Sequence, residues 1–328
     1  MKVLFIGGTG NISKAASRLC VERGFDLTLI NRGTTEAHFP GARTIVADIK
    51  NRAAVLAALA GGRWDAVVNW IAFEPGDVER DIELFRGRTA QYIFISSASA
   101  YQKPLSHPIV TESTPLCNPF WEYSRQKIAC EERLLRAYRD EGFPVSIVRP
   151  SLTYDTVIPV PIGGWKEFTI IDRIRLKRKI IVHGDGSSLW TITHAEDFAG
   201  GFVGLLGHQQ AVGQAFHITS DEILTWDQIY TAVANAAGEE PNIVHIASDF
   251  LARCEPSLSG SLLGDKAVSV VFSNEKIKRF VPDFRAVIPF SNGIRRTLDW
   301  FEEDPARCIV REETHRMMDR ILEAYERL

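Results

Sequence analysis

The sequence has little of what marks membrane, disulfide-rich or zinc-binding proteins. It is 328 residues long, and no stretch approaches 18 uninterrupted apolar residues, so no membrane span is expected. Its five cysteines are scattered and form no C-x-x-C pair, which indicates neither a disulfide framework nor a zinc site. The apolar run at the amino terminus is too short for a signal peptide. These absences favour a protein of the reducing cytoplasm.

An excess of positive charge is also missing. The chain has 38 Lys and Arg against 41 Asp and Glu, a formal net charge of −3. A balance this close to zero argues against a general nucleic-acid or anionic-membrane binder. Five basic residues gather between 173 and 179, but a solvated helix face is the simpler explanation of such a run. The eight histidines form no H-x-x-x-H pattern, so no metal site is expected.

Two hydrophobic periods alternate over the first 150 residues. Short continuous apolar runs are typical of strands buried on both faces. Between them, apolar residues recur at helical spacing, as at Ile12, Ala15, Ala16, Leu19 and Cys20. Strands are predicted at 3–6, 27–30, 66–71, 92–96 and 145–149, and helices at 12–24, 52–60, 77–85 and 122–139. This alternation predicts an α/β fold with a Rossmann-type, doubly wound parallel sheet.

The pattern loosens after Pro150. Residues 151–164 hold two prolines and two adjacent glycines directly after Pro150, which predicts a long functional loop. Beyond it we predict a strand at 215–219 and helices at 226–237, 293–302 and 311–327. We therefore expect a dinucleotide-binding domain over 1–155, completed by about 190–222. A smaller mixed domain that binds substrate should comprise 156–189 and 223–328.

A glycine-rich turn lies between the first strand and the first helix. Residues 7–13 read GGTGNIS, with Gly7 and Gly10 at G-x-x-G spacing and Ser13 as the third small residue. Glycines here allow a tight turn, and the free N–H groups of the following helix can bind a pyrophosphate. A plain strand-to-helix turn is the alternative, because a glycine pattern alone is a weak signal.

The end of the second strand bears on the choice of dinucleotide. An acidic residue there would hydrogen-bond the adenosine ribose of NAD, but this chain has Asn31 and Arg32. A guanidinium can hold a 2′-phosphate, so we favour NADP(H) over NAD, with a solvated loop charge as the alternative role of Arg32. Asp48, after the third strand, suits a bond to the adenine amino group or, equally, a helix N-cap.

Tyr123 and Lys127 stand at i, i+4 on a predicted helix and so share one face. Ser97 lies at the carboxyl end of the preceding strand, where α/β sheets place ligands. A phenol has a pKa of about 10, and a nearby ammonium favours the phenolate. This combination predicts a site in which Ser97 orients a reacting oxygen and Tyr123 moves its proton.

These segments together resemble the extended short-chain dehydrogenases/reductases, and most closely the NAD-dependent epimerase/dehydratase family. The resemblance rests on GGTGNIS, Asp48, FISSASAY, YSRQK and VRPSLTY in that order, and on HGDGSSLWTITHAEDFA at 183–199. It implies that Tyr123 is the acid/base, that Lys127 tunes it and binds the nicotinamide ribose, and that Ser97 orients the substrate. It also implies a homodimer formed through the helix at 122–139.

The resemblance completes the set of predicted ligand residues. For the cofactor these are Gly7, Thr9, Gly10, Asn11, Ile12, Asn31, Arg32, Asp48, Ile49, Ile71, Ala72, Ser96, Tyr123, Lys127, Pro150, Ser151 and Leu152. For the substrate they are Ser99, Cys117 and Trp190.

Two departures from the family pattern bear on the substrate. Sugar 4,6-dehydratases carry an Asp-Glu pair where this chain has Ala98 and Ser99, so dehydratase chemistry is not expected. Nucleotide-sugar epimerases usually carry an arginine where this chain has Trp190, so a diphosphate loses its clamp. Trp190 could stack on a sugar or serve as a core residue, and Cys117 could face the same pocket.

The expected function is therefore that of an NAD(P)-dependent epimerase or reductase, and the expected substrate is a small molecule of the carbohydrate class. The alternative is a non-catalytic protein that binds RNA or senses redox state. It arises because GQAFHITSDEILTWDQI and FSNEKIKRFVPDF resemble chloroplast stem-loop-binding relatives. The intact set of Ser97, Tyr123 and Lys127 favours the enzyme, since a binding protein has no need of all three.

Overall fold

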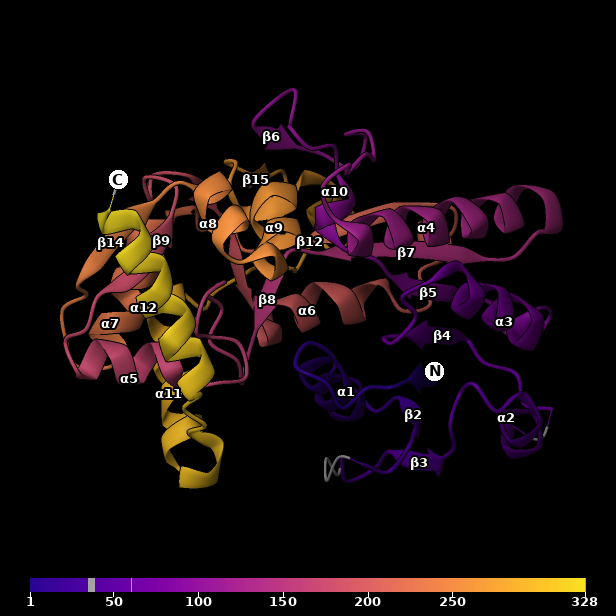
Figure 1. Ribbon diagram of the computed structural model, residues 1–328. Coiled ribbons are helices and arrows are strands. Elements are labelled where there is room, and N and C mark those ends of the chain that lie inside the picture. Colours follow the sequence, from indigo (N-terminus) through magenta and orange to yellow (C-terminus); the bar gives the residue numbers. More distant parts are fainter. Residues whose placement is uncertain (35–38, 60, 328) are drawn as a thin grey trace.

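A seven-stranded parallel sheet organises the amino-terminal part of the protein (Figure 1). The structure is a computed structural model that describes residues 1–34, 39–59 and 61–327. The strands follow the order β12-β7-β5-β4-β1-β2-β3, and every neighbouring pair is parallel. The order reverses between β1 and β4, so a ligand crevice is expected at the carboxyl ends of these two strands. The predicted Rossmann-type sheet is confirmed.

The elements of this sheet agree closely with the sequence predictions. The strands are β1 (Lys2–Ile6), β2 (Asp26–Asn31), β3 (Arg43–Val46), β4 (Ala66–Asn69), β5 (Tyr92–Ile95), β7 (Val145–Pro150) and β12 (Ala215–Ile218). The flanking helices are α1 (Ser13–Glu22), α2 (Arg52–Leu59), α3 (Pro75–Phe85), α4 (Glu122–Glu141) and α6 (Ala195–Leu205). The last residue of the predicted helix 52–60 lies outside the described residues.

The central strands are buried on both faces, as their continuous apolar runs require. In β1, Val3 and Phe5 pack with residues of α1 and α6, whereas Leu4 and Ile6 pack with residues of α2, α3 and α4. This alternation places one layer of helices on each face of the sheet. Neither layer covers the carboxyl edge, where the loops of the site lie.

The remaining chain forms a second cluster with its own core. It contains β8 (Leu152–Tyr154), β9 (Ile180–His183), β10 (Leu189–Trp190), β11 (Ile192–His194), β13 (Leu224–Thr225), β14 (Ile243–Ile246), α5 (Thr169–Arg175), α7 (Trp226–Ala236), α8 (Ser248–Cys254), α9 (Ser259–Ser261), α11 (Phe290–Glu302) and α12 (Glu312–Glu326). Helix α10 (Glu275–Phe280) instead packs on α6 and β12, and its Ile277 is buried in the core of the central sheet. Two short strands, β6 (Ile109–Val110) and β15 (Val271–Phe272), pair with each other. The predicted helices at 226–237, 293–302 and 311–327 correspond to α7, α11 and α12.

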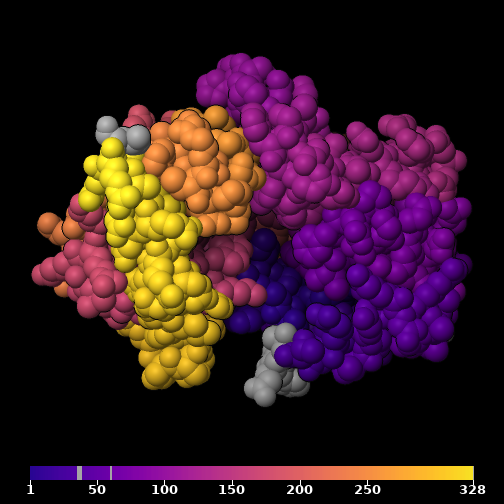
Figure 2. Space-filling view, in the orientation of Figure 1, coloured from indigo at the N-terminus to yellow at the C-terminus, as the bar shows by residue number. Residues whose placement is uncertain are grey.

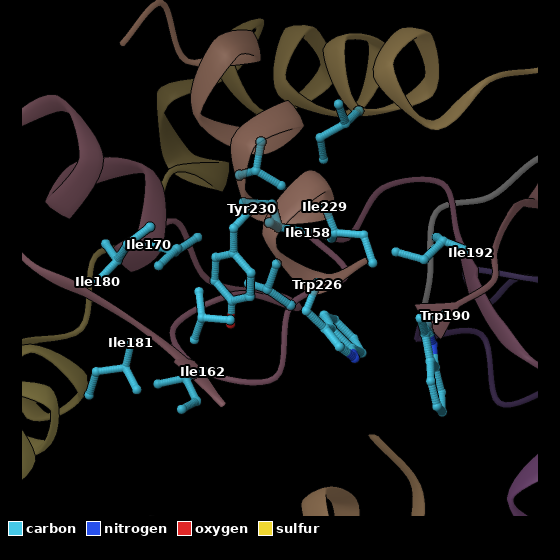
Figure 3. Close-up of a cluster of buried hydrophobic side chains, with 14 of the residues drawn as sticks. Ile158, Ile162, Ile170, Ile180, Ile181, Trp190, Ile192, Trp226, Ile229 and Tyr230 are labelled. Carbon is cyan, nitrogen blue, oxygen red and sulfur yellow. The ribbon is translucent and has the colours of Figure 1, made fainter. Parts of the chain in front are cut away.

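The segment 151–164 is less open than the predicted loop. It begins with β8, which pairs with β11. Val157, Ile158 and Ile162 are then buried in the second core, which also contains Trp226 and Tyr230. Figure 3 shows Ile158 and Ile162 in this core. The prolines and glycines suggested a loop, but the apolar residues between them supply enough buried surface to fix its path.

Candidate active site

In the glycine turn between β1 and α1, the glycines have no side chains that would cover the backbone at the start of α1. Gly7 and Gly8 have φ angles of 91° and 97°, in the region that favours glycine. A Cβ on Gly8 would lie 2.8 Å from Cδ2 of Leu29. The hydroxyl of Ser13 accepts a hydrogen bond from the N–H of Gly10 at 2.9 Å, which orders the turn. The backbone thus forms a cradle at a helix N-terminus that suits the diphosphate of a dinucleotide.

A cleft of about 870 Å³ runs from this turn along the carboxyl edge of the sheet. In Figure 2 the surface is hollowed between the purple amino-terminal part and the orange and yellow carboxyl-terminal segments. One wall comes from the glycine turn, the ends of β4, β5 and β7, and the first turn of α4. The opposite wall contains Pro159, Val160, Pro161, Trp165, Lys166, Ser261, Asp265 and Lys266. The size suits a drug-sized ligand or larger.

Lys127 is buried at the base of the cleft. Its ammonium donates hydrogen bonds to the carbonyl oxygens of Ala72, at 2.7 Å, and Ile95, at 2.8 Å. These carbonyls follow β4 and end β5, so the lysine ties α4 to two strand ends. Burial lowers the pKa of Lys127 to about 8.

Tyr123 and Ser97 meet above this lysine. Tyr123 is in the first turn of α4, and Nζ of Lys127 lies 5.8 Å from the centre of its ring. Burial raises the pKa of Tyr123, a hydrogen bond with the Ser97 hydroxyl opposes this, and the negative charge of Asp265 adds to it. The Ser97 hydroxyl also lies 2.9 Å from that of Ser99. The structure therefore brings the three predicted catalytic side chains into one cleft.

A buried polar network that the sequence did not predict holds the loop between β4 and α3. Asn69 accepts a hydrogen bond from the N–H of Ile71 at 2.8 Å and is itself bonded to Asp81. Burial raises the pKa of Asp81, which accepts a further bond from Tyr92 at 2.6 Å. This network fixes the loop whose carbonyl at Ala72 receives Lys127. A polar residue that ends a buried strand, as Asn69 does, is the signal that could have revealed it.

The predicted cofactor residues divide into two groups. Those that line the cleft are Gly7, Thr9, Gly10, Asn11, Ile12, Arg32, Ile71, Ser96, Tyr123, Lys127, Pro150, Ser151 and Leu152. Asn31, Asp48, Ile49 and Ala72 are not among the described lining residues. Asp48 is exposed and accepts a hydrogen bond from the N–H of Lys50 in the turn before α2, and Ile49 is buried in the core. The helix N-cap alternative for Asp48 is wrong, because Asn51 directly precedes α2 and accepts the bond from the N–H of Ala54.

Of the three predicted substrate residues, one lines the cleft. Ser99 lines the cleft, but Cys117 and Trp190 are not among the described residues that do. Trp190 is only 2% exposed, and its ring centre lies 5.6 Å from that of Trp226 in the second core (Figure 3). Of the two alternatives for Trp190, the structure therefore favours the core role over stacking on a sugar. Cys117 is exposed elsewhere, and its carbonyl accepts a hydrogen bond from Lys103.

Replacing Lys127 by Met is expected to stabilise the cofactor-free protein at neutral pH. Its folded pKa of about 8 lies below the usual 10.5, so keeping the charge costs the folded state on the order of 1–3 kcal/mol. The unfolded chain keeps its proton up to the ordinary pKa. The cost is therefore fully present below pH 8 and fades as pH rises toward 10.5. Urea unfolding of wild type and K127M at about pH 7 and 9.5 measures it.

The exposed Lys50 supplies the control for this prediction. K50M should leave the difference between the two pH values unchanged, because no burial acts on that ammonium. If K127M were less stable than wild type at neutral pH, the hydrogen bonds to Ala72 and Ile95 would outweigh the burial cost.

The sequence matches the profile of the NAD dependent epimerase/dehydratase family over residues 3–219. The chain belongs to this family. The match begins at the second residue of β1 and ends one residue after β12, so it covers all the predicted catalytic residues and the central sheet except Lys2.

Several proteins are similar to this chain in sequence or fold. Chloroplast stem-loop binding protein of 41 kDa b from Arabidopsis thaliana is 29% identical over 260 residues, which cover 74% of this chain and 65% of that protein. An epimerase from Methanothermobacter thermautotrophicus superposes with a TM-score of 0.76, at 16% identity and with 93% of each chain covered. Thermus thermophilus UDP-glucose 4-epimerase, in complex with NAD, gives a TM-score of 0.71 at 19% identity, covering 92% and 99% of the two chains. These structures share the fold. None of the described helices is both long and apolar enough to cross a membrane.

Proposed function

We propose that this protein is an NAD(P)-dependent epimerase or oxidoreductase that acts on a carbinol or carbonyl carbon of a sugar or sugar-nucleotide-like substrate. The convergence of Ser97, Tyr123 and Lys127 in one cleft with the glycine turn is the observation that carries the proposal. A nicotinamide bound there would accept or donate hydride. The remaining chemistry is proton movement and orientation, which these side chains can supply.

Each of the three side chains has a distinct part in the proposed mechanism. The Ser97 hydroxyl donates a hydrogen bond to the substrate oxygen and fixes its direction. The Tyr123 oxygen takes the proton from a carbinol or returns it to a carbonyl. The Lys127 ammonium, 5.8 Å from the centre of the Tyr123 ring, would favour the phenolate through its positive charge. Ala98 and Ser99 carry no carboxyl group. The proposed mechanism therefore lacks the acid/base pair that would eliminate water from the substrate.

The test of this proposal is a search for turnover with both dinucleotides over a panel of sugars and nucleotide sugars. An oxidoreductase consumes the dinucleotide in step with substrate, whereas an epimerase interconverts isomers with only a catalytic amount. A chain that binds neither dinucleotide and converts none of the panel contradicts the proposal.

We further propose that the preferred dinucleotide is NADP(H). Arg32 directly follows β2 and lines the cleft beside the glycine turn, where a 2′-phosphate would lie. Arg32→Ala should weaken NADP binding about ten- to hundredfold, since a charge-assisted bond is worth about 1.5–3 kcal/mol. Binding of NAD should change less than about twofold. Calorimetric titration with both dinucleotides measures this.

Arg23, exposed at the end of α1, provides the matched control. Arg23→Ala should alter neither affinity. Tighter binding of NAD than NADP by the wild-type chain, unchanged by Arg32→Ala, would reverse the proposed preference.

A second candidate function is non-catalytic binding of RNA, which the name of the Arabidopsis relative suggests. The basic run at 173–179 is its main support in the sequence. In the structure Arg173 pairs with Asp319, Arg175 with Glu302, Lys177 with Glu239 and Lys179 with Glu326. A run whose charges are largely matched within the chain offers little to a phosphate backbone. The enzyme therefore remains the favoured function, and a homodimer through α4 remains a prediction.

A further inference from the structure

A short π-helical turn, Leu262–Lys266, forms part of the cleft wall opposite the glycine turn. It lies outside the matched region 3–219, so the family gives it no role. Asn118 ties the turn to the catalytic side by donating to the carbonyls of Gly264, at 2.7 Å, and Ser99, at 2.8 Å. A Cβ on Gly264 would lie 2.9 Å from Cβ of Trp121, which shows how closely the turn docks. Such π-turns occur often at functional sites.

The turn carries an unbalanced set of buried charges. One oxygen of Asp265 lies 3.6 Å from the ammonium of Lys103, and the other lies 3.4 Å from that of Lys266. The two lysine side chains are 2% and 10% exposed. No other carboxylate of the described residues lies within 4.0 Å of either ammonium. Two buried cations therefore share one anion, an arrangement that is costly unless a further negative charge joins it.

The unbalanced charge faces the place where the substrate must sit. Asp265 and Lys266 line the cleft, as does Trp121. The Lys266 ammonium lies 5.7 Å from the centre of the Trp121 ring, which in turn lies 5.0 Å from that of Tyr123. A single aromatic ring thus separates the ammonium from the proposed acid/base. An anion bound by Lys266 would belong to the same small molecule as the reacting carbon.

We propose that Lys266 binds an anionic group of the substrate, a carboxylate or a phosphate, and that Lys103 and Asp265 position it. The substrate class is then a sugar acid or a sugar phosphate rather than a neutral sugar. This inference rests on the proposed function for the identity of the reacting carbon. The charge imbalance itself depends on the structure alone.

Calorimetric titration of the NADP-loaded protein with glucose, glucuronate and glucose 6-phosphate tests the proposal. The buffer should contain neither phosphate nor sulfate, and saturation with NADP keeps the anions away from the glycine turn. One of the two anions should bind at least tenfold more tightly than glucose, and which one does so distinguishes carboxylate from phosphate. Lys266→Met should abolish this preference, whereas Lys266→Arg, which keeps the charge, should retain it. Equal binding of all three, no binding of either anion, or a preference that survives in K266M overturns the proposal.

Urea unfolding without added anion provides a readout that needs no substrate. K266M removes one of the two ammonium groups that share Asp265, so its midpoint should equal or exceed that of wild type. Asp265→Asn removes the shared anion, so its midpoint should fall. A K266M midpoint that falls as far as that of D265N would make Lys266 a structural partner and overturn the proposal. Failure of the proposed function would instead appear as an absence of turnover by the NADP-loaded protein, with the anion preference intact.

Discussion

Tyr123→Phe should lower kcat by a factor of about a hundred to ten thousand while leaving the dissociation constant of the dinucleotide within about twofold of wild type. The magnitude is that of losing one positioned acid/base group. The variant keeps the ring, which packs 5.0 Å from that of Trp121, and removes only the oxygen that moves the proton. Steady-state kinetics and dinucleotide titration, made on the same preparation, separate the two effects.

The pH dependence gives a second readout for this variant. Burial raises the pKa of Tyr123, so the phenol holds its proton at neutral pH. In the direction of oxidation, kcat should rise with pH as the Tyr123 phenol loses this proton. The residual rate of Y123F should lack that rise, because its ring has no proton to lose.

Tyr138 supplies the matched control on the same helix. It is 39% exposed and lies four turns further along α4, away from the cleft. Tyr138→Phe should therefore leave kcat unchanged. Full turnover by Y123F would contradict the proposed mechanism, because the reaction would then proceed without the Tyr123 hydroxyl.

The parts of this protein that could be predicted from sequence are those encoded by local periodicity or short spacing. The run in β1 and the spacing of Tyr123 and Lys127 are local, and the structure places both as expected. Helix α6 was not predicted because three glycines interrupt its pattern. A Cβ on Gly204 would lie 2.5 Å from Val281, so packing between distant segments explains this glycine where local propensity does not.

The far wall of the cleft could not be predicted for the same reason. Lys103 and Asp265 are 162 positions apart, and neither belongs to a motif that marks the other as its partner. Trp190 lies at a position of the family motif, but the motif carries no information about Trp226, which packs against it in the folded protein. Sequence therefore identified the side of the cleft proposed to bind the cofactor, while only the fold revealed the side proposed to contact the substrate.

Glu131→Gln should destabilise the protein by about 3–5 kcal/mol, the largest stability effect expected from a single conservative change. Glu131 is fully buried and pairs with Arg149, whose guanidinium donates to both of its oxygens at 2.9 and 2.6 Å. The same carboxylate accepts a bond from the hydroxyl of Ser96 at 2.5 Å. An uncharged amide leaves the buried guanidinium unpaired and cannot accept at both positions. Urea unfolding at neutral pH measures the loss.

The neighbouring Glu132, exposed on α4, is the matched control, and E132Q should change stability by less than about 0.5 kcal/mol. Replacing both partners by apolar residues should cost less than E131Q, because no buried charge then lacks a partner. A small effect of E131Q would mean that solvent reaches Arg149. Glu131 also holds Ser96, which directly precedes the proposed catalytic Ser97. E131Q should therefore also lower kcat under conditions in which the protein is still folded.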